Sequence, residues 1–285
     1  MVPTIYHFLL LGSHRADFIC FGNKKGDQET EEEENIPELE VIRLSEIAPT
    51  ELGDLELWNM LYSVASGALS KVTTSKKPIT KRGIAVLNLA MSCPNQKLEC
   101  LELDRTGLDI AGARALASYL PSMLARLNLD GNQIGDDGAA DIVANLPSTI
   151  QLLWLDGNGI SDAGAIAIAP RLPASLRSLT LNGNQIGDPG VRALASWLPR
   201  SLDTLFLNAN RIGDLGAKVL AARMPPRLTR LSLSGNQIGG SGISAIVSSL
   251  PKSVAQLWLK DNPYGPIGTL AILGSWFATS AKIYW

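Results

Sequence analysis

The chain has 285 residues, a formal net charge of -2 at pH 7 and 18% charged residues. This balance leaves no general basic field that would hold nucleic acid. Hydrophobic residues make up 46% of the chain and aromatic residues only 6%, which is typical of a stacked array rich in leucine and alanine. The most apolar run near the start, residues 5–11, is too short to span a bilayer. We therefore expect neither nucleic acid nor membrane among the partners.

Residues 1–35 are predicted to form a hairpin followed by an acidic linker. Residues 5–11 and 16–21 are apolar and flank a polar turn, which favours two paired strands. A cleaved secretory signal is the alternative for residues 5–11, although no Lys or Arg precedes them. Residues 24–35 are charged and lack apolar side chains, so we expect a solvated linker. A docking role for this acidic run is the alternative.

Residues 36–97 are interpreted as an N-terminal capping region. Residues 39–47 follow the apolar spacing of a strand, and residues 50–69 that of a helix. A basic loop at 75–80 precedes a second predicted helix at 82–92, which Pro94 would end. Such irregular turns would shield the first regular repeat from water, since terminal repeats must differ from internal ones. A small independent domain is the alternative, but about sixty residues without a staple would be marginally stable.

From residue 98 to the end, the chain repeats one pattern every 26 residues, L-x-x-L-x-L-x-x-N-x-I-G-D-x-G-A-x-x-L-A-x-x-L-P. The asparagine of this pattern recurs at Asn132, Asn158, Asn184, Asn210, Asn236 and Asn262. A fixed period of this length with this leucine spacing indicates a leucine-rich repeat solenoid. We therefore predict an α/β fold for residues 98–285, with a concave parallel sheet and convex helices.

Each position in the repeat has a physical reason. The leucines point inward from a short strand, and the residues between them point to the opposite face. The asparagine side chain is expected to satisfy backbone groups in the turn that follows, which forms an asparagine ladder. Asp136, Asp162, Asp188 and Asp214 stand where helices begin, so their carboxylates are expected to accept free N–H groups there. Residues 281–285 keep the register and predict a last, truncated strand within a C-terminal cap.

This pattern resembles the ribonuclease-inhibitor type of leucine-rich repeat. That type also occurs in Ran GTPase-activating proteins, NOD-like receptor sensors and repeat proteins injected by intracellular bacterial pathogens. The resemblance covers residues 98–285 and implies a horseshoe whose concave sheet binds another protein. The uniform 26-residue step is more similar to bacterial or protist members than to the longer, alternating repeats of the vertebrate inhibitor. The family implies the architecture and does not name the partner.

The variable strand positions are the candidates for function, because they tile the concave face. Three large aromatic residues stand on alternate repeats where the fold needs no apolar group, and arginines accompany them; exposed aromatic and Arg residues often dominate binding energy. Three aspartates form an acidic ridge, which would either steer a basic partner or be solvated. The predicted partner-binding residues are Trp154, Phe206, Trp258, Arg126, Arg230, Asp104, Asp130, Asp156, Glu102 and Lys260.

The sequence offers little for catalysis. His7 and His14 are the only histidines, and no metal-ligand or nucleophile-base spacing surrounds them. No glycine-rich phosphate loop occurs either. The row of single aspartates does not close the cage of roughly six or more oxygens that calcium requires. We therefore predict no catalytic residues, no metal and no cofactor, and we do not expect an enzyme.

We expect a protein-protein interaction module that binds a folded partner on the concave face. The resemblance to ribonuclease inhibitors implies inhibition of a partner enzyme by occlusion of its active site. GTPase activation of the Ran-activator type is the alternative, with Arg82 and Arg105 as weakly motivated candidates. Action as a bacterial effector on a host protein, or on another effector, is a further reading. Three widely spaced cysteines favour a reducing compartment, so we expect a monomer in the cytoplasm, including that of a host cell.

Overall fold

The computed structural model describes residues 65–68, 70–74, 78–275 and 279–285, all of which belong to one compact unit, Asn59–Trp285. The hairpin and acidic linker predicted for residues 1–35 lie outside the described residues. So do the strand predicted at 39–47 and most of the helix predicted at 50–69. The boundaries between the predicted capping region and the repeats therefore remain a prediction.

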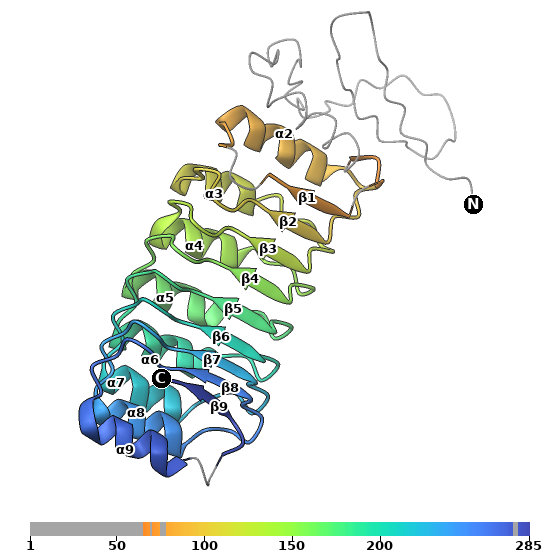
Figure 1. The fold of residues 1–285 in the computed structure, drawn as a ribbon. Coiled ribbons are helices and arrows are strands. Elements are labelled where there is room, and N and C mark those ends of the chain that lie inside the picture. Colours follow the sequence, from red (N-terminus) through yellow and green to blue (C-terminus); the bar gives the residue numbers. More distant parts are fainter. Residues whose placement is uncertain (1–64, 69, 75–77, 276–278) are drawn as a thin grey trace, which may run out of the picture. The chain divides into compact units, whose positions relative to one another are not determined.

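Within the described residues, nine strands form one parallel sheet in chain order (Figure 1). Their register follows the sequence period, so that Leu127 pairs with Leu153 and Leu153 with Leu179. The strands are β1 (Lys71–Thr73), β2 (Cys100–Glu102), β3 (Arg126–Asn128), β4 (Leu152–Trp154), β5 (Ser178–Thr180), β6 (Thr204–Phe206), β7 (Arg230–Ser232), β8 (Gln256–Trp258) and β9 (Lys282–Tyr284). The last strand confirms the one predicted at residues 281–285.

The first strand is not apparent from the 26-residue period. β1 pairs with β2 through Lys71 and Cys100, a step of 29 residues. A search for copies at the regular step therefore passes over it, although Val72 is fully buried as the repeat leucines are.

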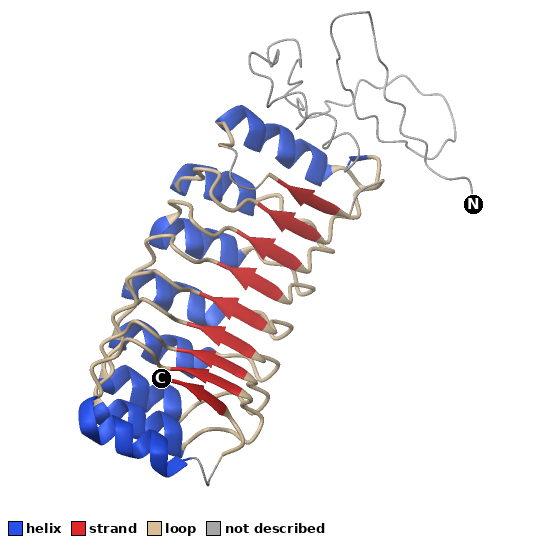
Figure 2. Cartoon of the chain, viewed as in Figure 1, coloured by secondary structure: helices blue, strands red, loops and turns tan. Residues whose placement is uncertain are grey.

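Helices cover one face of the sheet and leave the other uncovered (Figure 2). Helix α2 begins after Thr80, whose hydroxyl accepts the N–H of Gly83, and it confirms the helix predicted at residues 82–92. A short 3₁₀ helix, η2 (Ala169–Arg171), extends one of the repeats. The helices are α2 (Lys81–Ser92), α3 (Ile110–Ala117), α4 (Gly135–Ala144), α5 (Asp162–Ile168), α6 (Asp188–Trp197), α7 (Asp214–Ala221), α8 (Gly240–Ser248) and α9 (Gly265–Ser275).

The core lies between the two layers and repeats with the sequence. In the fourth strand's repeat, Leu153, Leu155 and Ile160 have no exposed surface, and Ala165 and Ile168 meet them from α5. Each buried leucine or isoleucine side chain stabilises the fold by about 1.5–3 kcal/mol. Since every repeat contributes the same set, the expected solenoid is confirmed as one continuous core without a central hydrophobic cluster.

The asparagine ladder is confirmed. The Oδ1 atom of Asn184 accepts the backbone N–H groups of Asn158 and Ile160, at 3.0 Å each. Its Nδ2 group donates to the carbonyls of Leu155 and Leu181, also at 3.0 Å. Each asparagine thereby joins the turn of its own repeat to the turn of the preceding one.

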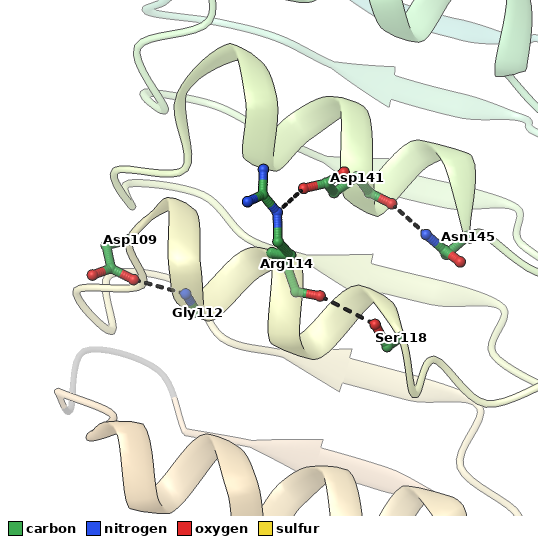
Figure 3. Close-up of polar contacts among 6 residues, drawn as sticks. All are labelled: Asp109, Gly112, Arg114, Ser118, Asp141 and Asn145. Carbon is green, nitrogen blue, oxygen red and sulfur yellow. Dashed lines mark hydrogen bonds and ion pairs between the residues drawn. The ribbon is translucent and has the colours of Figure 1, made fainter.

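The helix-start aspartates act across repeats, which differs from the local capping that the sequence suggests. Asp162 is the first residue of α5, yet its Oδ1 atom accepts the N–H groups of Gly187 and Gly190 at the start of α6, at 2.7 and 2.9 Å. Asp188 repeats this bond to Gly213. By contrast, Asp109 caps its own helix, α3, by accepting the N–H of Gly112 at 2.7 Å (Figure 3). The carboxylates therefore join neighbouring helices, because stacking places one repeat's carboxylate at the next helix's positive end.

The outer surface of the helices carries an ion pair between neighbouring repeats. Arg114 Nε of α3 donates to Asp141 Oδ2 of α4 at 2.8 Å (Figure 3). Both side chains are substantially exposed, so solvent screening leaves the pair only a small contribution to stability. Among the described residues, no helix is long and apolar enough to cross a membrane.

Candidate functional site

We define the open face as the surface made by the first and third residues of each strand, which point away from the helices. Small residues at these positions, including Ser178, Thr180 and Ser232, are buried between larger neighbours. The accessible surface is consequently provided by the large side chains, most of which are the aromatic and arginine residues predicted from the sequence. The open face corresponds to the concave face of the sequence prediction.

A groove of ≈ 780 Å³ crosses the open face from β1 to β7. Trp154 and Phe206 line it, and both side chains are partly exposed. Arg126 and Arg230 line it as well, together with Arg177, which immediately precedes β5. The groove thus brings together four of the predicted binding residues and adds an arginine that alternation along the strand did not place on this face.

The aromatic side chains form two separate features. Phe206 and Trp258 meet edge to face, with ring centroids 5.8 Å apart and planes at 81°. Trp258 also stacks on Tyr284, with centroids 5.2 Å apart and planes at 7°. We call Phe206, Trp258 and Tyr284 the aromatic cluster. Trp154 stands apart from it, four strands from β8, on the order of 19 Å at the spacing of parallel strands. Mutual packing holds the cluster in place, which reduces the entropy lost on binding.

Tyr284 is absent from the sequence prediction, although it stands 26 residues after Trp258. The register itself was the signal that would have found it. Lys282 lies beside it, with Nζ 5.0 Å from the centre of the Tyr284 ring. No such signal pointed to Arg177, because it precedes β5 and lies outside the alternating strand positions.

The charges of the N-terminal strands are partly paired. Glu102 accepts hydrogen bonds from Lys71 Nζ and Thr73 Oγ1, each at 2.8 Å. The hydrogen bond from Lys71 is the main cause that lowers the pKa of Glu102. Glu102 is therefore held by β1 and offers less to a partner than its position suggested. Lys260, the other predicted charge at the far end, is exposed.

The acidic ridge has a structural use in addition to its predicted role. Asp130 Oδ1 accepts the backbone N–H of Asp156 at 2.7 Å, and Asp156 Oδ1 accepts that of Asn182 at 2.8 Å. Asn182 and Asn208 repeat the same bond, at 2.8 Å each, to Asn208 and Ser234. This is a second ladder, at the exit of each strand, in which Asp and Asn serve equally as acceptors. Binding by Asp104, Asp130 and Asp156 remains a proposal.

Asp130 is a carboxyl group whose pKa is strongly perturbed by its surroundings. Burial, with smaller contributions from the negative charges of Asp156 and Asp104, raises its pKa from 3.8 to about 6. The hydrogen bond from the Asp156 N–H and the charge of Arg105 act in the opposite direction. The ionised form of Asp130 is therefore disfavoured in the folded chain.

Asp130→Asn is expected to stabilise the protein at pH 7 and to remove a pH dependence. Because the folded-state pKa lies above the usual 3.8, the stability that Asp130 contributes is present below about pH 4 and lost as the pH rises through about 6. Asparagine keeps the acceptor oxygen without the charge, as Asn182 does in the same ladder. We expect a gain of about 1 kcal/mol at pH 7 and little near pH 4, after allowance for solvent screening.

Urea unfolding at pH 4, 5, 6, 7 and 8 checks this prediction. Asp137→Asn, which removes an exposed carboxylate of α4, is the control for a change in net charge. A difference between Asp130→Asn and the original chain that stays constant across this range would contradict the assignment.

The described residues contain no group of three or more His, Cys, Asp or Glu residues placed to hold a metal ion. Cys93 and Cys100 are buried thiols, and burial raises the pKa of the Cys100 thiol. The histidines considered in the sequence, His7 and His14, lie outside the described residues.

A family model described as Leucine Rich repeat matches residues 121–143, 147–169, 173–195 and 226–247. The matched segments run from the proline that ends one helix to the end of the next. Together with the parallel sheet and the asparagine ladder, they identify the repeat. The array has the leucine-rich repeat fold.

A solved leucine-rich repeat structure shares this fold, and others are similar to this chain. The leucine-rich repeat-containing protein LegL7 of Legionella pneumophila is 21% identical, with a TM-score of 0.51, over 71% of this chain and 69% of that chain. A leucine-rich repeat protein of Leptospira interrogans is 19% identical, with a TM-score of 0.47, over 77% of this chain and 49% of that one. At these identities the likeness concerns the fold alone. A comparison with curated proteins gives no match.

A third structure is an octameric complex of Latrophilin 3, Unc5D and FLRT2, of which FLRT2 supplies the leucine-rich repeats. It is 19% identical, with a TM-score of 0.44, over 73% of this chain and 66% of that chain. Leucine-rich repeat domains are typical protein-protein interaction modules, and this chain has the architecture of that class.

Proposed function

We propose that this leucine-rich repeat protein binds a folded protein partner on the open face of its sheet. The observation that carries the proposal is the set of large aromatic side chains, Trp154, Phe206 and Trp258, at positions where the fold requires none. Each is partly exposed although small residues would satisfy the strand. Exposed aromatics of this kind cost solvation free energy in the free protein, which a partner would recover.

The surroundings of these aromatics support a protein partner rather than a small molecule. Arg126 and Arg230 accompany them, and Trp, Tyr and Arg are the residue types that dominate binding energy at protein interfaces. The distance of about 19 Å between Trp154 and Trp258 suits an interface of roughly 800 Å² per partner. The groove is open along the sheet and extends over seven strands, whereas sites for small molecules usually bury most of the ligand surface.

The test compares two triple variants in affinity capture followed by calorimetry. Trp154→Ala, Phe206→Ala and Trp258→Ala together are expected to weaken binding of the captured partner by about a hundredfold or more. The control removes three exposed apolar side chains of the helices, Ile166→Ala, Trp197→Ala and Leu215→Ala. Equal affinities for the two triple variants would refute the open-face site, and circular dichroism would verify that both fold.

Inhibition of an enzyme is the consequence that we propose for this binding, since a partner held along the groove would have its own surface covered. If the captured partner is an enzyme, its activity should fall as the leucine-rich repeat protein is added and return with the aromatic triple variant. Action as an effector on a host protein or on another effector belongs to the same proposal, because the same surface would carry it. An unchanged activity of the captured partner at saturation would contradict inhibition.

GTPase activation has less support in the structure. Arg105 is exposed, but its aliphatic stem packs over Gly131, where a Cβ atom would lie 2.7 Å from Arg105 Cγ. Arg82 lies in α2, and its side chain is outside the described part of the chain. We therefore do not adopt this alternative as the function of the open face.

A further inference from the structure

We propose that the partner places an acidic, extended segment in the groove, where Arg126, Arg177 and Arg230 bind its carboxylates. This inference rests on the proposed function and specifies the chemistry of the partner. It starts from the arginine row, by which we mean these three residues. They come from β3, from the residue before β5 and from β7, and all three line the groove.

The arginine row is available to a ligand. All three side chains are exposed, and none of them forms an ion pair with the part of the chain that the structure describes. Arg230 Nε donates one hydrogen bond, to Thr204 Oγ1 at 3.1 Å, which orients the guanidinium group and leaves its other N–H groups free. Guanidinium groups bind carboxylates through paired, charge-assisted hydrogen bonds, so an acidic side chain is their best protein ligand.

The other charges that line the groove do not cancel the row. Lys71 is paired with Glu102 at 2.8 Å, so this cation and this carboxylate largely neutralise each other. Asp203 accepts a hydrogen bond from Thr204 Oγ1 at 2.7 Å. Glu99 remains as an exposed carboxylate at the β2 end. Three arginines then face two carboxylates, and this excess of positive charge lies in a chain whose net charge is -2.

The spacing of the row suggests the conformation of the segment. Its members stand on alternate strands, about 9.6 Å apart at the spacing of parallel strands. A polyproline II chain returns to the same side every third residue, after about 9.3 Å. Carboxylates at every third position would therefore meet successive arginines. Trp154 and Phe206 stand on the strands between them and would contact the apolar residues in between.

The acidic ridge on the other side of the open face favours a peptide over a nucleic acid. Asp104, Asp130 and Asp156 lie at the exits of β2, β3 and β4, beyond the row of Trp154. A continuous polyanion that covered the face would approach these carboxylates, whereas a peptide can place acidic residues on the arginine side only. The opposite signs of the two sides would also fix the direction in which the segment lies.

The experiment selects displayed random peptides of 12 residues on the whole chain and then measures the affinity of the enriched peptides. We expect enrichment of Asp and Glu at intervals of three residues. The variant Arg126→Gln, Arg177→Gln and Arg230→Gln should bind these peptides at least about tenfold more weakly. A charge-matched control, Arg114→Gln, Arg192→Gln and Arg223→Gln on the helix side, should bind them as the original chain does.

Several results would overturn the inference, and they separate it from the proposed function. Enriched peptides without acidic residues that depend on Trp154, Phe206 and Trp258 would reject the acidic segment and keep the open-face site. Acidic peptides that bind both arginine triple variants equally would also reject the arginine row. Peptides that depend on neither set of residues would reject both proposals. A thymidine 12-mer that binds as tightly as the best peptide, and loses binding with the arginine row, would replace the peptide by a nucleic acid.

Discussion

Asn184→Ala is expected to lower the free energy of unfolding by about 4 kcal/mol, because it removes a fully bonded step of the asparagine ladder. The side chain is 6% exposed and makes hydrogen bonds to the backbone of Asn158, Ile160, Leu155 and Leu181. Alanine would leave two buried N–H groups without an acceptor, at about 1–3 kcal/mol each, together with the carbonyls that lose their donor.

Asn158→Ala is the matched comparison, on the neighbouring step. Asn158 is 1% exposed, but its Oδ1 atom has no hydrogen-bond partner among the described residues. The turn before α4 differs from the others: Gly135, at φ 60°, donates its N–H to the Asn158 carbonyl. Only the Nδ2 bonds, to Leu129 and Asp156, would be lost. We expect a destabilisation of about 2 kcal/mol.

Urea unfolding followed by circular dichroism and tryptophan fluorescence measures both variants. Coincidence of the two signals must be verified, since stacked repeats do not always unfold as one unit. Equal destabilisation of the two variants would show that the Oδ1 bonds contribute little and that loss of buried side-chain volume accounts for the effect.

Gly190→Ala is expected to destabilise the protein by about 3 kcal/mol although alanine is the better helix former. A Cβ atom at Gly190 would lie 2.6 Å from Asp162 Oδ1 and 2.8 Å from Ile186 Cγ2. The same Oδ1 atom accepts the N–H groups of Gly187 and Gly190. The carboxylate would have to move, and both of its hydrogen bonds would weaken.

Gly274→Ala provides the control, because it makes the same substitution in another helix, α9. No atom lies within 4 Å of a Cβ placed at Gly274, so only helix propensity changes. We expect a stabilisation of up to about 1 kcal/mol, opposite in sign to Gly190→Ala. Thermal unfolding of both variants checks the pair, and a Gly190→Ala protein as stable as the original would mean that the repeats can separate slightly at no cost.

The contacts of Gly190 show which part of the packing could be predicted from the sequence. In the sequence, a glycine stands two residues after each helix-start aspartate, as Gly190 does after Asp188, and this spacing predicts close packing of the helix on the sheet. The structure places the close approach elsewhere, against the aspartate of the preceding repeat and a small residue of its helix, such as Ala165. The pattern indicated that there is little space for a side chain at Gly190. It could not indicate which atoms fill that space, because they include those of Asp162, 28 positions earlier.

For the candidate site, the sequence predicted which residues lie on one face but not which of them are in contact. Trp154, Phe206, Trp258, Arg126 and Arg230 could be assigned to one face, because alternation along short strands is a local rule. The same rule could not show that Phe206 and Trp258 touch across the intervening Ser232, since this depends on the size of a neighbour in the next strand. Nor could the rule show that Lys71 forms an ion pair with Glu102, because β1 precedes β2 by an irregular step of 29 residues.

The repeat, the fold class, the inward leucines, the asparagine ladder and the face of the variable residues could all be predicted from the amino-acid sequence. All of these features follow from the 26-residue repeat of the sequence and from interactions that recur in each repeat. The three-dimensional arrangement was needed to show which side chains line one groove, which charges are paired and that Arg177 lines the same groove as Arg126 and Arg230. These features depend on contacts between unlike residues of different repeats, and a repeating pattern carries no information about them.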